Sequence, residues 1–179
     1  MPVKIIYFVH GTTVDNENDV ATGQVDGELS SLGVKQSNEL PDQIGNVSFD
    51  VVFCSDLDRS VNSAEISFGN DYDIIQDRRL RECNYGDLNQ APGDQVNYDE
   101  HIKEPFPHGE CLRDVEERIE DFLNYLRKNY NGKHIAIVAH RAPQLALEVI
   151  LNNKSWERAI KNDWRKVGEW QPGWAYKVA

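Results

Sequence analysis

Short apolar runs alternate with amphipathic segments along most of this chain. Residues 3–9, 50–54 and 134–139 are runs rich in β-branched side chains, and residues 73–76 form a shorter run of the same kind. This pattern is typical of strands that are buried on both faces of a parallel sheet. The segment 174–178 (WAYKV) predicts a further strand at the edge of that sheet.

Helical periodicity lies between these runs. It is clearest from 112 to 126, where acidic residues face away from apolar residues at spacings of three and four. These apolar residues are Leu112, Val115, Ile119, Phe122, Leu123 and Leu126. Weaker helical patterns cover 31–40, 57–67, 143–151 and 155–163. The alternation predicts an α/β fold, a three-layer α/β/α sandwich whose sheet is mostly parallel with an antiparallel edge strand.

The length of 179 residues fits one domain over 1–179. Residues 89–108 hold three prolines and little periodicity, so we interpret them as a long excursion outside the core that caps the substrate. All four tryptophans lie late in the chain, where we expect them to cover the sheet edge. They are Trp156, Trp164, Trp170 and Trp174.

Composition and charge exclude several classes of function. The net charge of −11 disfavours broad contact with nucleic acid or anionic lipid, and no apolar run approaches the roughly 18 residues of a membrane span. The first residues lack the features of a signal peptide, and the odd number of cysteines fits reduced thiols. We therefore expect a cytoplasmic monomer or homodimer whose anionic ligand meets a locally basic pocket.

Two histidines follow hydrophobic runs at the points where strands are expected to end. His10 comes after IIYFV, and His140 comes after IAIVA. Ligands in open α/β sheets bind beyond the carboxyl ends of the strands. A single histidine there is more often structural, but the repeated placement predicts that both belong to one site. His101, His108 and His134 lack this context, and we assign them no role.

Arg59 lies one turn into the helix expected after the second apolar run, close to the same crevice. Its guanidinium suits phosphate, because it is permanently charged and donates in a planar fork. A surface salt bridge with Asp56 or Asp58 is the alternative. Glu82 lies after the short apolar run 73–76. It is either a proton donor or one exposed carboxylate among many, and its position alone does not decide between these two roles.

Ordered sequence blocks span nearly the whole chain. They are HGTTVDN (10–16), GELSSLGVKQS (27–37), SDLDRSVNSA (55–64), LRECNYGDL (80–88), FPHGECLRDVEERIEDFL (106–123) and IAIVAHRA (135–142). In this order they resemble the blocks of the histidine phosphatase superfamily, in its phosphoglycerate mutase-like branch of short phosphatases.

The resemblance implies a metal-independent phosphomonoesterase without a cofactor, acting on a small phosphorylated metabolite and releasing inorganic phosphate. His10 would be the nucleophile that forms a phosphohistidine, with Asn16 and Arg59 holding the phosphoryl oxygens. His140 would be the second histidine of the pocket, and Glu82 the general acid and then base. Neutral imidazole is a competent nucleophile near pH 7, which fits these roles. The remaining expected phosphate-binding residues are Gly11, Thr22, Gly23 and Arg141.

The chain departs from the family pattern beside both histidines. The pattern has an arginine directly before the first histidine, where this chain has Val9, so one phosphate-binding guanidinium is absent. After His140, where the family usually has glycine, this chain has Arg141. We hypothesise that Arg141 supplies the missing cation; a solvated residue at a helix start is the alternative.

Other functions remain open at the level of sequence. Asp56 and Asp58 follow a strand, as in the magnesium-dependent aspartate phosphatases of the haloacid dehalogenase type, but in the second strand instead of the first. Cys54 and Arg59 are separated by four residues, whereas the loop of cysteine phosphatases requires five. A non-catalytic phosphate-binding module of the same fold and a phosphoglycerate mutase-like transferase are the further alternatives.

Overall fold

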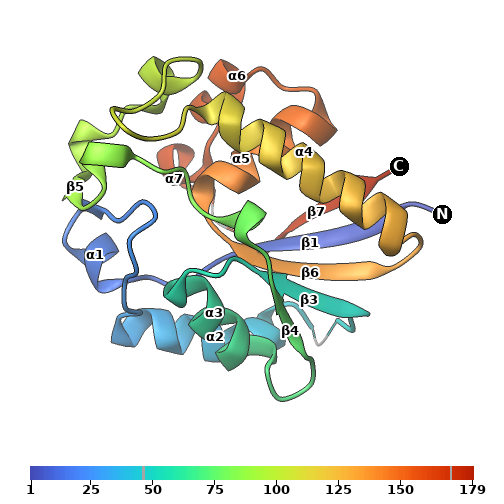
Figure 1. The fold of residues 1–179 in the computed structure, drawn as a ribbon. Helices are drawn as coiled ribbons and strands as arrows, with labels where there is room; N and C mark the ends of the chain where they lie inside the picture. Colours follow the sequence, from blue (N-terminus) through green and yellow to red (C-terminus); the bar gives the residue numbers. More distant parts are fainter. Residues whose placement is uncertain (46, 170) are drawn as a thin grey trace.

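A five-stranded mixed sheet forms the centre of the molecule (Figure 1). The computed structural model describes residues 1–45, 47–169 and 171–179. The strands, in spatial order, are β4 (Ile74–Gln76), β3 (Val51–Cys54), β6 (His134–Ala139), β1 (Val3–Val9) and β7 (Trp174–Val178). The first four run parallel, and β7 pairs antiparallel with β1. The predicted α/β fold with an antiparallel edge strand is confirmed.

Helices cover both faces of the sheet (Figure 1). One face carries α2 (Ser31–Gln43) and α3 (Asp58–Phe68), and the other carries α4 (Leu112–Asn129), α5 (Arg141–Asn152) and α6 (Trp156–Lys161). Side chains alternate across each strand, so Tyr7 joins the core cluster beneath α4 and α5, while Phe8 joins the cluster beneath α3. The six apolar residues predicted to form the inner face of α4 are its buried residues.

Several short elements escaped the sequence prediction. They are α1 (Val14–Glu17), β2 (Val20–Ala21), η1 (Arg78–Leu80), η2 (Gly86–Leu88), β5 (Ala91–Pro92), η3 (Gly93–Gln95), η4 (Tyr98–His101) and α7 (Trp164–Val167). Strands β2 and β5 pair antiparallel in a separate small sheet, which joins the segment 89–108 to the loop after β1. The prediction made for Trp170 lies outside the described residues.

The segment 89–108 lies partly in the core, so its interpretation as an excursion outside the core was wrong. Tyr98, Ile102 and Phe106 are buried in the same hydrophobic cluster as α4 and α5. They act as isolated anchors of an irregular segment. Because no helical or strand period links them, the sequence pattern does not reveal their burial.

The parallel register brings the ends of three strands together. Val9 of β1 pairs with Ala139 of β6, and Val138 of β6 pairs with Cys54 of β3. The backbone N–H of His10 extends this pairing by donating to the carbonyl of Ala139 at 3.0 Å. The residues that follow these strands therefore lie close together, at the carboxyl ends of the parallel strands. Within the described residues, no helix combines the length and apolar content needed to cross a membrane.

Core burial of α4 can be tested with a matched pair of leucine substitutions. Leu123 is 0% exposed, whereas Leu32 of α2 is 48% exposed. Leu123→Ala is expected to lower the free energy of unfolding by about 2–5 kcal/mol, because it leaves a cavity. Leu32→Ala is expected to change it by less than about 0.5 kcal/mol. Urea unfolding followed by circular dichroism measures both; similar losses would contradict the assigned faces.

Candidate active site

His10 and His140 lie side by side where β1 and β6 end. Their ring centroids are 5.1 Å apart, with an interplanar angle of 60°. Tyr7 fixes the backbone of His140 from the neighbouring strand, since its hydroxyl donates to the His140 carbonyl at 2.7 Å and accepts from the His140 N–H at 2.9 Å. The two strand ends thus hold both imidazoles in one place.

His10 has a defined tautomer. Its Nδ1 lies 2.7 Å from the carbonyl oxygen of Gly11. A carbonyl oxygen can only accept, so Nδ1 carries the hydrogen and Nε2 of the neutral ring carries the lone pair. Burial, followed by the positive charges of Arg59 and Arg165, lowers the pKa of His10 to about 3. The ring is therefore neutral, with a nucleophilic nitrogen, at neutral pH.

His140 is fully buried and bonded on one side only. Its Nε2 lies 2.7 Å from the hydroxyl of Ser55, which also accepts from the N–H of Leu57 at 3.1 Å. Within the described residues, the buried Nδ1 of His140 has no hydrogen-bond partner. Burial, followed by the charge of Arg59, lowers the pKa of His140 well below its ordinary value, so this ring too is neutral.

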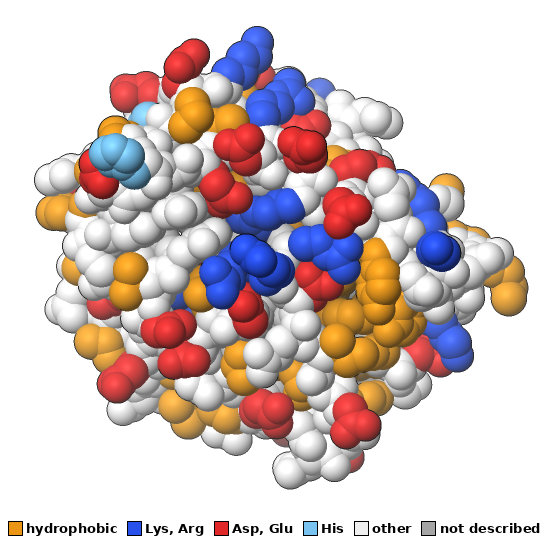
Figure 2. Space-filling view, in the orientation of Figure 1, with side chains coloured by type: hydrophobic (Ala, Val, Ile, Leu, Met, Phe, Trp, Pro, Cys, Tyr) orange, Lys and Arg blue, Asp and Glu red, His pale blue; other side chains and the backbone are white. Residues whose placement is uncertain are grey.

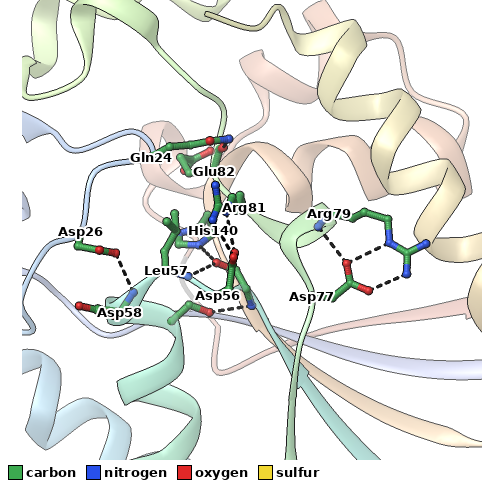
Figure 3. Close-up of polar contacts among 12 residues, drawn as sticks. Gln24, Asp26, Asp56, Leu57, Asp58, Asp77, Arg79, Arg81, Glu82 and His140 are labelled. Atoms are coloured by element: carbon green, nitrogen blue, oxygen red, sulfur yellow. Dashed lines mark hydrogen bonds and ion pairs between the residues drawn. The ribbon is translucent and has the colours of Figure 1, made fainter.

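The carboxylate of Glu82 caps helix α5. Its Oε2 accepts from the N–H of Arg141 at 3.1 Å, and its Oε1 accepts from the N–H of Ala142 at 3.0 Å and of Cys83 at 2.8 Å. The Tyr98 hydroxyl lies 3.4 Å from Oε1. Figure 3 shows Glu82 close to His140, and the position of Glu82 is fixed by the first turn of the helix that follows this histidine.

Arg59 is a buried side chain of α3 that reaches the loop after β2. Its Nη2 donates to the carbonyl of Gly23 at 2.6 Å, and its Nη1 donates to the carbonyl of Val25 at 2.9 Å. Gly23 adopts a positive φ of 62°, a conformation that suits glycine. Arg59 therefore orders this loop, and its charge lies close enough to both imidazoles to lower their pKa values.

The other predicted phosphate-binding residues differ in whether they line the cavity that contains His10. Asn16 and Thr22 line the same cavity as His10. The amide oxygen of Asn16 accepts from the N–H of Thr13 at 3.0 Å, and the Thr22 hydroxyl donates to Asp15 at 2.9 Å. Gly11 does not line this cavity, and its N–H donates to the Ser63 hydroxyl at 2.9 Å.

A cavity of about 410 Å³ connects these groups. Its walls come from the loop after β1, from the start of α3, from the segment 89–108 and from α7. The charged residues that line it are Arg59, Glu82, Arg141 and Arg165. The cavity is thus rich in positive charge, although the whole chain carries a net charge of −11.

Two arginines of this cavity share one buried carboxylate. Nε of Arg141 donates to Oδ2 of Asp163 at 2.6 Å, and Nη1 of Arg165 donates to Oδ1 of Asp163 at 2.9 Å. The Arg141 guanidinium also lies over the ring of Tyr98, 4.2 Å from its centroid. Arg165, Asp163 and Tyr98 were not among the predicted site residues, because none follows a predicted strand or repeats a periodic pattern.

Part of the charge outside the cavity is arranged in ion pairs. On the face drawn in Figure 2, Lys and Arg side chains gather near the centre, with Asp and Glu side chains beside them. Arg79 pairs with Asp77 and Asp121, and Arg118 pairs with Glu110. Among residues 1–45, 47–169 and 171–179, no group of three or more His, Cys, Asp or Glu side chains could hold a metal ion.

The side chains that the alternative phosphatase mechanisms would use as nucleophiles are either paired with another residue or buried in the core. Both carboxylate oxygens of Asp56 accept from Arg81 at 2.7 Å, as Figure 3 shows. Cys54 is fully buried in the core cluster beneath α3, and burial raises the pKa of its thiol to about 12. Neither side chain has the geometry of a nucleophile next to Arg59.

Comparisons with known proteins point to one family. Residues 6–166 match the model of the histidine phosphatase superfamily (branch 1). Fructose-2,6-bisphosphatase TIGAR from Xenopus tropicalis is 36% identical over 129 residues, which are 65% of this chain and 47% of that protein. Phosphoserine phosphatase 1 from Hydrogenobacter thermophilus is 27% identical over 156 residues, 81% of this chain and 74% of that protein. The chain thus spans about half the length of the Xenopus protein.

Solved structures share the fold. YhfR from Bacillus stearothermophilus superposes with a TM-score of 0.78 at 23% identity, covering 88% of this chain and 83% of that one. A phosphoserine phosphatase from Entamoeba histolytica, solved with 3-phosphoglyceric acid, gives a TM-score of 0.77 at 23% identity, covering 89% and 84%. At this identity the likeness shows a common architecture.

The neutral state of His10 has a measurable effect on stability. The unfolded chain protonates this histidine near 6.5 and the folded chain only near 3, so the unfolded state binds more protons in between. Acidification through that window therefore lowers the free energy of unfolding, by up to about 1.4 kcal/mol per pH unit for one group.

His10→Asn is expected to remove this contribution while keeping a donor for the Gly11 carbonyl. Urea unfolding of both proteins at pH 6.5 and pH 4.5 measures it. The wild type should lose more stability than the variant on acidification. Equal losses would show that His10 is protonated normally in the folded state.

Proposed function

Because this chain belongs to branch 1 of the histidine phosphatase superfamily, we propose that it hydrolyses a small phosphorylated metabolite through a phosphohistidine at His10. The observation that carries the proposal is the neutral His10, whose Nδ1 is bonded to the Gly11 carbonyl and whose Nε2 is the available nucleophile. Glu82 and Arg59 line the same cavity as this imidazole.

In the first step, Nε2 of His10 attacks phosphorus and the bond from phosphorus to the leaving oxygen breaks. Glu82, in its acid form, gives its proton to that oxygen, so the product leaves as an alcohol. The phosphorylated imidazole becomes cationic, and its Nδ1–H remains bonded to the Gly11 carbonyl. A covalent intermediate replaces one difficult step by two easier ones.

In the second step, water attacks the phosphohistidine and the P–N bond breaks. Glu82 now takes a proton from the water, so inorganic phosphate forms and His10 returns to its neutral state. The N–H groups of α5 hold Glu82, so its carboxyl group would stay on the same side of the cavity in both proposed steps. One residue can therefore act first as acid and then as base.

Three groups would hold the phosphoryl oxygens. Arg59 contributes its permanent charge, and Asn16 contributes its amide nitrogen, because its amide oxygen accepts from Thr13. When the Ser55 hydroxyl donates to Nε2 of His140, Nδ1 carries the hydrogen and becomes the third donor. Such donors stabilise the charge of the transferred phosphoryl group, so the proposed mechanism requires no metal.

The substrate class follows from the cavity and from the relatives. A volume of about 410 Å³ suits a small metabolite. The named activities of the two relatives, fructose-2,6-bisphosphatase and phosphoserine phosphatase, concern small phosphorylated molecules. Gly93 and Val96 bring the segment 89–108 to the cavity wall, and we propose that this segment caps the substrate.

A screen of phosphorylated metabolites, with His10→Ala as control, tests the proposal. The wild type should release phosphate from at least one compound, in excess chelator as well, and carry an acid-labile phosphoryl label. His10→Ala should lose both label and turnover. Phosphate binding without turnover or label would instead support a non-catalytic module.

The role of Glu82 is tested by Glu82→Gln, with Glu117→Gln on the exposed face of α4 as the matched control. Loss of proton transfer is expected to lower kcat by about 10²- to 10⁴-fold. Rapid-quench measurements should find the label on His10 forming and decaying more slowly. Glu117→Gln should behave as wild type, and so would Glu82→Gln if Glu82 only capped α5.

A further inference from the structure

Arg165 lies in the wall of the cavity, where two contacts hold its guanidinium. Its Nη1 is paired with Asp163, whose side chain is 0% exposed, and its guanidinium lies over the Trp164 ring, 4.5 Å from the centroid. Trp164 in turn stacks on Trp174 of the edge strand, with centroids 5.7 Å apart. The short helix α7 is therefore anchored to the sheet next to β1, at the side of the molecule where α1 and β5 also lie (Figure 1).

Unsatisfied donors cluster around this part of the cavity. Within the described residues, the buried nitrogens Nη2 of Arg165, Nε1 of Trp164 and Nδ1 of His140 have no hydrogen-bond partner. Arg165 and Trp164 line the cavity together with His10, against whose ring His140 lies. Buried donors left without acceptors are costly, and a charged one is especially so. Anionic oxygens in the cavity would offset the charge of Arg165, which lines it beside His10.

The ligand that matches these donors is an anion. Arg165 brings a permanent charge, and its planar fork still has Nε and Nη2 to donate after Nη1 has bonded to Asp163. After burial, the charges that lower the pKa of His10 are those of Arg59 and then Arg165, so both guanidiniums act at the nucleophile. Arg141 instead lies over Tyr98, and its charge opposes the burial that raises the pKa values of Tyr85 and Tyr98.

Val9 lines the cavity together with Trp164 and Arg165 of α7. It packs against the core cluster beneath α4 and α5, as Trp174 does. A longer side chain at position 9 would therefore extend toward the space that α7 borders. The guanidinium missing at this position is matched by one that comes from α7.

We propose that Arg165 binds the phosphoryl group beside His10 and replaces the arginine that the family pattern has at the position of Val9. This inference rests on the proposed phosphatase function and adds a residue to its site. Arg59 and Arg165 hold the phosphoryl oxygens from two directions. Arg141, fixed to the other oxygen of Asp163, faces the part of the cavity next to Tyr98.

Arg165→Met and the matched control Arg158→Met, at an exposed arginine of α6, test the proposal. The probes are inorganic phosphate, by calorimetry, and p-nitrophenyl phosphate, by hydrolysis. Arg165→Met is expected to weaken phosphate binding at least tenfold and to lower kcat/KM about a hundredfold. Arg158→Met should stay within about twofold of wild type, as expected for an exposed position.

A second pair of variants tests the replacement itself. Val9→Arg in the Arg165→Met background should recover at least tenfold in kcat/KM, because it returns the guanidinium to the family position. Arg165→Lys keeps a charge beside Asp163 but loses the fork, and it should bind phosphate several-fold more weakly. This variant decides the question if Arg165→Met does not fold, as circular dichroism would show.

Wild-type phosphate affinity in a folded Arg165→Met or Arg165→Lys would overturn the proposal, as would a wild-type protein that does not bind phosphate. No recovery in the double variant would overturn the replacement of position 9. If the wild type binds phosphate but neither hydrolyses nor labels, the phosphatase function fails, and the affinities still decide the role of Arg165.

Discussion

The candidate site depends on one interaction between distant segments, the carboxylate of Glu82 at the N-terminus of α5. This helix begins directly after His140, which provides no side-chain cap. The first N–H groups of a helix have no partner within it and carry its positive dipole end. Glu82 satisfies those of Arg141 and Ala142. One contact therefore fixes the second histidine, the candidate proton donor and the arginine between them.

Cations around the imidazoles serve two purposes at once. A histidine beside a carboxylate gains proton affinity, whereas burial next to a guanidinium removes it. His10 has a backbone carbonyl on Nδ1, and Arg59 and Arg165 supply the nearby charge. Positive charge that would attract a phosphoryl group thus adds to burial in lowering the pKa of His10, the proposed nucleophile. In the proposed mechanism, binding and nucleophilicity would therefore both benefit from one arrangement of charge.

The sequence predicted what depends on periodicity and on strand ends, and missed what depends on single distant contacts. Apolar runs predicted the strands, the apolar spacing in α4 matched its buried face, and the two strand ends placed His10 and His140 in one region. Arg165 lies on a helix of four residues, too short for a periodic signal. Tyr98 looked like part of an exposed loop, because isolated anchors leave no pattern. Contacts of this kind become visible only in three dimensions.

Charge balance within the cavity links the proposed binding step to the proposed proton transfer. Arg59, Arg141 and Arg165 line the cavity, with the buried Asp163 behind two of them and Glu82 in its wall. The three guanidiniums and Asp163 together carry two net positive charges, which match the charge of a phosphomonoester dianion. Glu82 lies in the wall of the same cavity, so the proposed proton transfer would take place next to the groups proposed to hold the phosphoryl oxygens.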